Sequence, residues 1–129
     1  MTVFVAYAHT PEGQAALERG AQISRREQLP LVVFDLEAAS DAPDRSIPAT
    51  VPLPDGEGLD VRWLARDARS NDATGELIDL VHTVEPDVVV VGVRPRTSVG
   101  KFLLGSNAQR IIIDSPAPVL AVKADRHEK

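Results

Sequence analysis

The sequence predicts an α/β fold: a single domain, residues 1–129, built on an open five-stranded parallel doubly wound sheet with helices on both faces. Three observations predict it. Short runs rich in Val, Ile and Leu alternate with helical segments, in the order strand, helix, strand, loop, strand, helix, strand, loop, helix, strand. Residues 88–91 are four valines, as expected of a parallel strand covered on both faces. Aromatic residues make up only 4% of the chain, so its core must be aliphatic.

The first helix lies between the first two strands. Residues 2–8 and the run LVVFDL at 31–36 are apolar and rich in β-forming residues, so both are expected to be buried strands. Thr10 and Pro11 are a typical helix start, and the helix is predicted to continue to about Arg26. Its small and apolar residues form a stripe that lets it lie close to the sheet; they are Ala16, Leu17, Gly20, Ala21 and Ile23.

The middle of the chain is predicted to hold a loop, the third strand and the second helix. Residues 41–58 contain four of the ten prolines, which predicts an irregular surface loop. Residues 59–64 (LDVRWL) alternate between apolar and charged residues, a pattern typical of a strand that is exposed on one face or lies at an edge. The helix is expected over 72–83, before Glu85 and Pro86; its core positions are Ala73, Leu77, Leu80, Val81 and Val84.

The last helix is expected over 105–113 and the last strand over 117–123, and residues 124–129 should form a frayed polar tail. Ligands of doubly wound sheets bind at the carboxyl ends of the strands, where the strand order reverses. The candidate site therefore combines the loop after the first strand, the end of the second strand and the long loop after the valine strand. The order of the elements does not decide which two strands flank this point.

The net charge of -5 is distributed unevenly along the chain. Residues 88–113 contain no Asp or Glu but hold four cations, Arg94, Arg96, Lys101 and Arg110. This cationic segment suits a compact anion such as a phosphate-bearing small molecule, whereas the acidic remainder would repel the extended backbone of a nucleic acid. The simpler alternative is that these residues are solvated loop charges.

Several chemistries are excluded or disfavoured. The absence of cysteine removes disulfides and thiolate sites, and the three histidines, His9, His82 and His127, lack the spacing of a metal site. There is no G-x-S-x-G motif for a hydrolase nucleophile, and no strand ends in an acidic residue that would obviously hold Mg²⁺. No apolar run is long enough to cross a membrane and no signal segment is evident. We therefore expect a cytoplasmic binding protein and not an enzyme.

The start of the last helix is a candidate phosphate site. Helix N-termini present unpaired amides and a partial positive charge, and Gly105, Ser106 and Asn107 stand at this one. Glycine lets the backbone approach ligand oxygens, and the Ser106 hydroxyl adds a donor, although an N-cap is the plainer role for that serine. Gly100 and Lys101 do not make a P-loop, because a proline replaces its first glycine and a phenylalanine its Ser or Thr.

The spacing Gly92-x2-Pro95-x9-Gly105-Ser106 resembles the G-x2-G-x9-G-S/T signature of the universal stress protein family. The similarity covers essentially the whole chain, from the first strand and helix, VFVAYAHTPEGQAAL, to the terminal strand PVLAVK. The resemblance implies a five-stranded parallel α/β domain, dimerisation through the last strand and, in one subgroup, binding of ATP. It also implies a role in stress response and regulation, without a settled enzymatic reaction.

On this resemblance the ligand is ATP or another adenine nucleotide, with or without Mg²⁺. Gly92 would end its strand and turn the loop, and Gly105 and Ser106 would receive the phosphates. The base is expected to pack between Tyr7-Ala8 and Leu36. The charge of the segment, and not the resemblance, adds Arg94, Arg96 and Lys101 as phosphate contacts, and Gly100 would give the loop flexibility. The full set of expected contact residues, none of them catalytic, is Tyr7, Ala8, Thr10, Leu36, Gly92, Arg94, Arg96, Gly100, Lys101, Gly105, Ser106 and Asn107.

Three departures from the family pattern leave an alternative open. Pro95 replaces the second glycine, which removes an amide donor and stiffens the loop. Ala8, His9 and Thr10 stand where nucleotide-binding members have Asp-Gly-Ser, so an acidic contact to the nucleotide is absent and only the hydroxyl is retained. Residues 41–58 are shorter and richer in proline than the family's excursion. The alternative is a dimeric regulatory or scaffold protein that has lost nucleotide binding; missing acidic groups disfavour a weak ATPase.

The terminal segment Pro118–Val122 is short and apolar. A terminal strand at a sheet edge leaves unpaired backbone groups, which favour pairing with a symmetry mate. The sequence therefore predicts a homodimer through this strand, with a strand already covered within its own subunit as the alternative.

Overall fold

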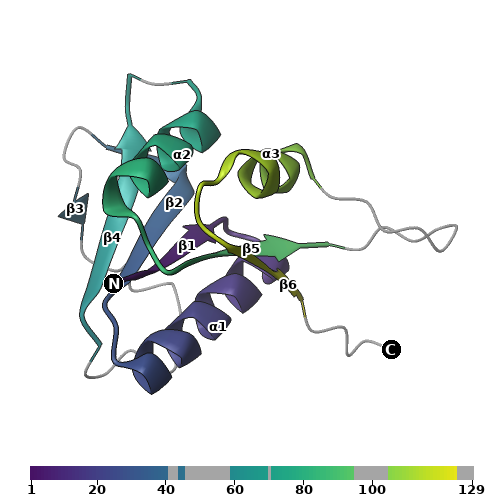
Figure 1. Cartoon of the computed structure of the whole chain (residues 1–129). Coiled ribbons are helices and arrows are strands. Elements are labelled where there is room, and N and C mark those ends of the chain that lie inside the picture. Colours follow the sequence, from purple (N-terminus) through teal and green to yellow (C-terminus); the bar gives the residue numbers. More distant parts are fainter. Residues whose placement is uncertain (41–43, 46–58, 70, 95–104, 125–129) are drawn as a thin grey trace, which may run out of the picture.

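The structure, a computed structural model, describes residues 1–40, 44–45, 59–69, 71–94 and 105–124. The elements in chain order are β1 (Val3–Tyr7), α1 (Pro11–Glu27), β2 (Leu31–Ser40), β3 (Asp44–Arg45), β4 (Val61–Asp67), α2 (Ala73–Val84), β5 (Val88–Val93), α3 (Ser106–Asp114) and β6 (Val119–Lys123). They form three layers, with the sheet between α1 on one face and α2 and α3 on the other (Figure 1). In the described part of the chain, no helix is both long and apolar enough to cross a membrane.

Five parallel strands carry the sheet in the order β4-β2-β1-β5-β6, which confirms the predicted fold. The chain first adds strands on one side of β1 and then on the other, so the order reverses between β1 and β5. This is the point that the sequence could not identify, and the place where such sheets bind ligands. The two-residue β3 pairs antiparallel with the outer edge of β4, a local difference from the irregular loop expected over 41–58. Most of that expected loop lies outside the described residues.

Strand β2 is longer than predicted and is interrupted at one point. Asp35 and Ala39 pair with consecutive residues of β4, Ala65 and Arg66, so residues 36–38 form a bulge in the ladder. Bulges re-aim side chains and are frequent beside functional sites. Here the bulge lies at the carboxyl end of the sheet, next to the reversal of strand order.

Helix α1 begins as the sequence predicted. Thr10 is its N-cap, and its hydroxyl oxygen accepts a hydrogen bond from the backbone N–H of Gly13 at 3.0 Å. The helix ends at Gln28, which adopts the left-handed conformation with φ 59°. A Cβ at Gly20 would stand 2.4 Å from a methyl group of Val5, so the predicted small-residue stripe does bring the helix close to the sheet.

Alternation along the strands divides the core into two clusters. Val5 and Tyr7 of β1 belong to the cluster under α1, whereas Phe4 and Ala6 belong to the cluster under α2 and α3. Trp63 of β4 joins the α1 cluster, where 1% of its surface is exposed. Most of the side chains that cover the two faces are aliphatic, as predicted, but the three largest fully buried ones are aromatic: Trp63, Phe4 and Phe34.

Candidate functional site

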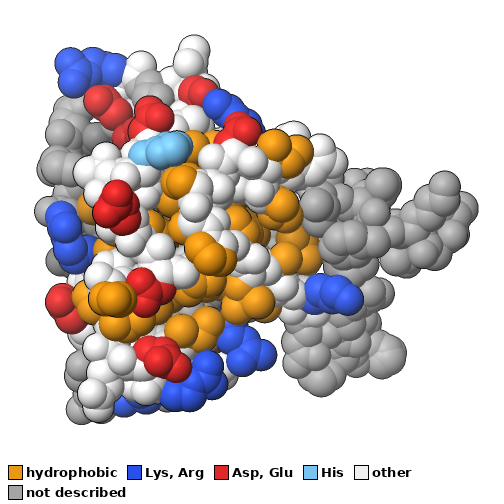
Figure 2. All heavy atoms as spheres, viewed as in Figure 1, with side chains coloured by type: hydrophobic (Ala, Val, Ile, Leu, Met, Phe, Trp, Pro, Cys, Tyr) orange, Lys and Arg blue, Asp and Glu red, His pale blue; other side chains and the backbone are white. Residues whose placement is uncertain are grey.

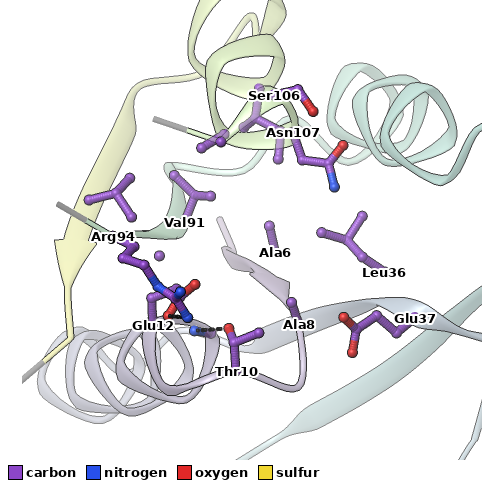
Figure 3. A pocket seen from close by; sticks show the side chains of 16 residues that line it. Ala6, Ala8, Thr10, Glu12, Leu36, Glu37, Val91, Arg94, Ser106 and Asn107 are labelled. Atoms are coloured by element: carbon purple, nitrogen blue, oxygen red, sulfur yellow. Dashed lines mark hydrogen bonds and ion pairs between the residues drawn. The ribbon is translucent and has the colours of Figure 1, made fainter. Parts of the chain in front are cut away.

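A cavity of about 440 Å³ opens at the carboxyl ends of β1 and β5 (Figure 3). Its walls come from the loop after β1, the first turn of α1, the bulge of β2, the end of β5 and the first turn of α3. Eight of the twelve residues predicted from sequence line it; they are Ala8, Thr10, Leu36, Gly92, Arg94, Gly105, Ser106 and Asn107. The volume lies within the range of about 300–1,000 Å³ that is usual for small-molecule sites.

The other four predicted residues are not in the wall as the structure describes it. Three of them lie outside the described residues: Arg96, Gly100 and Lys101. The fourth, Tyr7, is a difference from the expectation. Its ring lies on the α1 face of the sheet, 5.2 Å from the ring of Trp63, because strand alternation turns it away from the cavity that Ala6 and Ala8 line.

The floor of the cavity is formed where β5 meets the first turn of α1. Gly92 lies inside β5 and does not end it, which corrects the expected role of a turn residue. A Cβ at this position would stand 2.0 Å from the carbonyl oxygen of Glu12, so the strand and the helix can touch only because Gly92 has no side chain. Gly13 is in the same situation, with a built Cβ 2.0 Å from the carbonyl oxygen of Ala8.

The rim opposite the floor is the first turn of α3. Gly105 is the N-cap of this helix, with φ -66° and ψ 160°, and makes no side-chain cap hydrogen bond. Ser106 is the first helical residue, so the plainer role of N-cap does not apply to it. The Asn107 side-chain oxygen accepts a hydrogen bond from the Thr74 hydroxyl at 2.8 Å, which fixes the helix start against α2. The first amides of α3 have no partner within the helix and can receive an anion.

The described cation of the cavity, Arg94, faces a carboxylate that the sequence reasoning missed. One of its guanidinium nitrogens lies 3.4 Å from a carboxylate oxygen of Glu12 in the first turn of α1 (Figure 3). The Arg94 side chain is 58% exposed and that of Glu12 19%, so the pair is partly screened by solvent. An anionic ligand therefore meets a cation whose charge is already partly balanced.

Arg110, another member of the cationic segment, pairs away from the cavity. Its guanidinium binds both carboxylate oxygens of Asp72, the N-cap of α2, at 2.7 and 3.0 Å. The hydrogen bonds from Arg110 hold the pKa of Asp72 below its usual value, and Asp72 in turn raises the pKa of Arg110. This pair joins α2 to α3 and contributes no free charge to the cavity.

A hydrogen-bonded cluster lies where the ends of β1 and β2 meet. Asp35 is 1% exposed; one carboxylate oxygen lies 3.0 Å from His9 Nε2, and the other accepts the backbone N–H of Glu37 at 3.0 Å. Glu37 Oε1 accepts the backbone N–H of His9 at 2.9 Å, and its side chain lines the cavity. Burial, followed by the charges of Asp35 and Glu37, raises the pKa of the Tyr7 hydroxyl.

The comparisons with known proteins agree with this architecture. The model of the family described as "Universal stress protein family" matches residues 64–123. A universal stress protein of Mycolicibacterium smegmatis is 34% identical over 125 residues, covering 94% of this chain and 96% of that protein.

Solved structures show the same fold. A universal stress protein from Archaeoglobus fulgidus matches with a TM-score of 0.70 at 18% identity, covering 95% of this chain and 98% of that one. A structure of the universal stress protein from the same organism in complex with dAMP matches with a TM-score of 0.62 at 16% identity, with the same coverage. Since the Mycolicibacterium relative is similar over nearly its full length, this chain belongs to the universal stress protein family.

Proposed function

We propose that this chain is a binding module for an adenine nucleotide in stress response, with ATP as the nucleotide that the family resemblance favours. The observation that carries the proposal is the cavity at the reversal of strand order, where the first turn of α3 faces the ends of β1 and β5. The dAMP complex of the Archaeoglobus fulgidus protein supports an adenine nucleotide as the ligand class.

The phosphates lie at the rim in this proposal. The amides at the start of α3 and the Ser106 hydroxyl are the hydrogen-bond donors that would receive them. A Cβ built at Gly105 meets no atom of the described residues within 4 Å, which leaves open space beside those amides. Arg94 adds positive charge across the cavity, although it shares that charge with Glu12.

The base lies at the other end, between Ala8 and Leu36. Both residues line the cavity, and apolar walls beside them are supplied by Ala6 and Val91. An aromatic base gains from burial against such side chains. Tyr7 takes no direct part, because its ring is on the far face of the sheet.

The module acts through binding and not through catalysis in this proposal. A ligand at the start of α3 touches the same helix that exposes Ile112 and Ile113, so nucleotide binding can change which partner this surface accepts. No group of three or more His, Asp or Glu side chains in the described ranges could hold a metal ion. We therefore propose no protein-made site for Mg²⁺.

The test is to identify the nucleotide that freshly purified protein carries. Mass spectrometry after denaturation should find an adenine nucleotide, and calorimetric titration of the stripped protein with ATP, ADP and AMP should give saturable binding. If nothing is carried and no nucleotide binds at millimolar concentration, the proposal fails. The alternative, a dimeric scaffold that has lost nucleotide binding, would then take its place. Ala8 in the cavity wall, where nucleotide-binding members have an acid, favours that alternative.

We also propose a homodimer through the segment Pro118–Val122. Strand β6 ends the strand order, so one of its edges carries no further strand in the described part of the chain. Leu120 on this strand is 38% exposed, and Ile113 on the neighbouring α3 is 76% exposed; Figure 2 shows apolar side chains at the surface over α3. Light scattering at several concentrations should give the mass of a dimer, and a monomer at every concentration would exclude this contact.

A further inference from the structure

Glu37 is placed in the cavity by the bulge of β2. Residues 36–38 have no partner in the ladder to β4, and the side chains of Leu36 and Glu37 both reach the cavity wall. Figure 3 shows the Glu37 carboxylate on the side of the cavity next to Ala8 and Leu36, away from Ser106. It therefore stands at the end where the proposed function places the base.

The Glu37 side chain is exposed, and one hydrogen bond orients its carboxylate. Oε1 accepts the backbone N–H of His9 at 2.9 Å, and the backbone N–H of Glu37 donates to the buried Asp35 at 3.0 Å. The remaining oxygen, Oε2, accepts no hydrogen bond from any residue that the structure describes. An ionised carboxylate accepts hydrogen bonds and donates none, so the cavity offers one oriented acceptor at this end.

We infer that the Glu37 carboxylate selects the nucleobase by accepting a hydrogen bond from the exocyclic amino group of adenine. This inference rests on the proposed function and specifies which feature of the ligand is read. The amino group is the hydrogen-bond donor that adenine carries at position 6. A purine without a donor there forms no hydrogen bond with this carboxylate oxygen, which costs affinity. The acid that is missing at Ala8 is thus supplied from the neighbouring strand.

The experiment compares two ligands on three proteins. Calorimetry gives the affinities of AMP and of purine riboside 5′-monophosphate, which lacks only the amino group, for the wild type, Glu37→Gln and Glu12→Gln. In Glu37→Gln the side-chain carbonyl can keep the His9 hydrogen bond, which turns an amide NH₂ towards the base in place of an acceptor. Glu12→Gln is the matched control, because it removes the same charge from the wall of the same cavity at the other end.

The wild type and Glu12→Gln should both bind AMP about tenfold more tightly than the purine analogue, on the scale of a hydrogen bond to a charged group. Glu37→Gln should lose this preference while its far-ultraviolet circular dichroism stays that of the wild type. Equal binding of both ligands by the wild type, or tighter binding of GMP than of AMP, overturns the inference and leaves the proposed function standing. Absence of binding by any nucleotide overturns both.

Discussion

The two glycines that frame the cavity have opposite surroundings. At Gly92 a Cβ would stand 2.0 Å from the carbonyl oxygen of Glu12 and 2.4 Å from its carbonyl carbon, whereas at Gly105 no atom of the described residues lies within 4 Å. Neither glycine has a positive φ, so conformational freedom explains neither of them. Gly92 is needed because helix and strand touch on the floor, and Gly105 leaves room at the rim.

Gly92 and Gly105 belong to one sequence motif, but this difference assigns them to two properties: Gly92 to the stability of the fold and Gly105 to ligand binding. A side chain added on the floor meets backbone that belongs to the sheet and to α1, so it must disturb the fold. A side chain added at the rim enters the space that the proposed ligand needs and meets nothing else in the described structure. Changes on the floor should therefore alter the free energy of unfolding, and changes at the rim should alter affinity.

The largest effect is expected for Gly92→Ala. The new methyl group would overlap the backbone of Glu12, and relief requires α1 to move away from β5. We expect the free energy of unfolding to fall by about 3 kcal/mol, as measured by urea denaturation. The matched control is Gly105→Ala, which should change it by less than about 1 kcal/mol. Equal losses for the two variants would contradict the distinction between floor and rim.

The next effect is on affinity and concerns Gly105→Leu. The bulky side chain would fill the space beside the amides at the start of α3, so nucleotide affinity should fall at least about tenfold, or 1.4 kcal/mol. The free energy of unfolding should stay within about 1 kcal/mol of the wild type, because leucine is only a poorer N-cap than glycine. Calorimetric titration with AMP or ATP measures the affinity. A variant that folds and binds as the wild type does would place the phosphates elsewhere.

The sequence alone predicted the fold because the fold depends on local signals that it carries. The start of α1 at Thr10 and Pro11 and the four-valine strand follow from capping, fixed φ and burial, which act within a few residues. The position of the strand-order reversal depends on which strands pair, and that is decided by contacts between residues far apart in the sequence. Only the structure placed it between β1 and β5.

The cavity was predicted less completely than the fold, and for the same reason. The motif spacing led to Gly105, which lines the wall, but the role of Gly92 depends on contact with a helix about 80 residues earlier in the sequence. The Glu37 carboxylate enters through a bulge that no local residue pattern announced. Tyr7 was expected to contact the nucleobase. Side chains alternate along a strand, so the sequence could have shown that Tyr7 faces away from Ala6 and Ala8.

A smaller effect on nucleotide affinity is expected for Glu12→Gln, a change on the floor beside the proposed ligand. Glu12 belongs to the floor, yet its carboxylate pairs with Arg94 and partly neutralises its charge. Arg94 faces the space proposed for the ligand. Glu12→Gln should raise nucleotide affinity by about threefold, the scale of a partly exposed charge pair. The gain should shrink as salt is added, because salt already screens the repulsion between the Glu12 carboxylate and the nucleotide phosphates that the substitution removes. Titration at low and high ionic strength measures it, and an unchanged or lower affinity would mean that Arg94 does not serve the ligand.

The smallest effect concerns the side of the sheet opposite the cavity and depends on pH. Tyr7, on the α1 face of the sheet, has a pKa raised above 10.0 by burial and by the charges of Asp35 and Glu37. The unfolded chain loses this proton near pH 10, before the folded protein does, so the free energy of unfolding should fall as the pH rises from 10.0 towards the folded-state pKa. Tyr7 is the sole tyrosine, so tyrosinate absorbance reports its titration directly. Glu37→Gln should lower that pKa, and Tyr7→Phe should abolish the part of the alkaline loss that Tyr7 causes. A tyrosinate midpoint at or below 10.0 in the folded protein would show that Tyr7 is not held in buried surroundings beside Asp35 and Glu37.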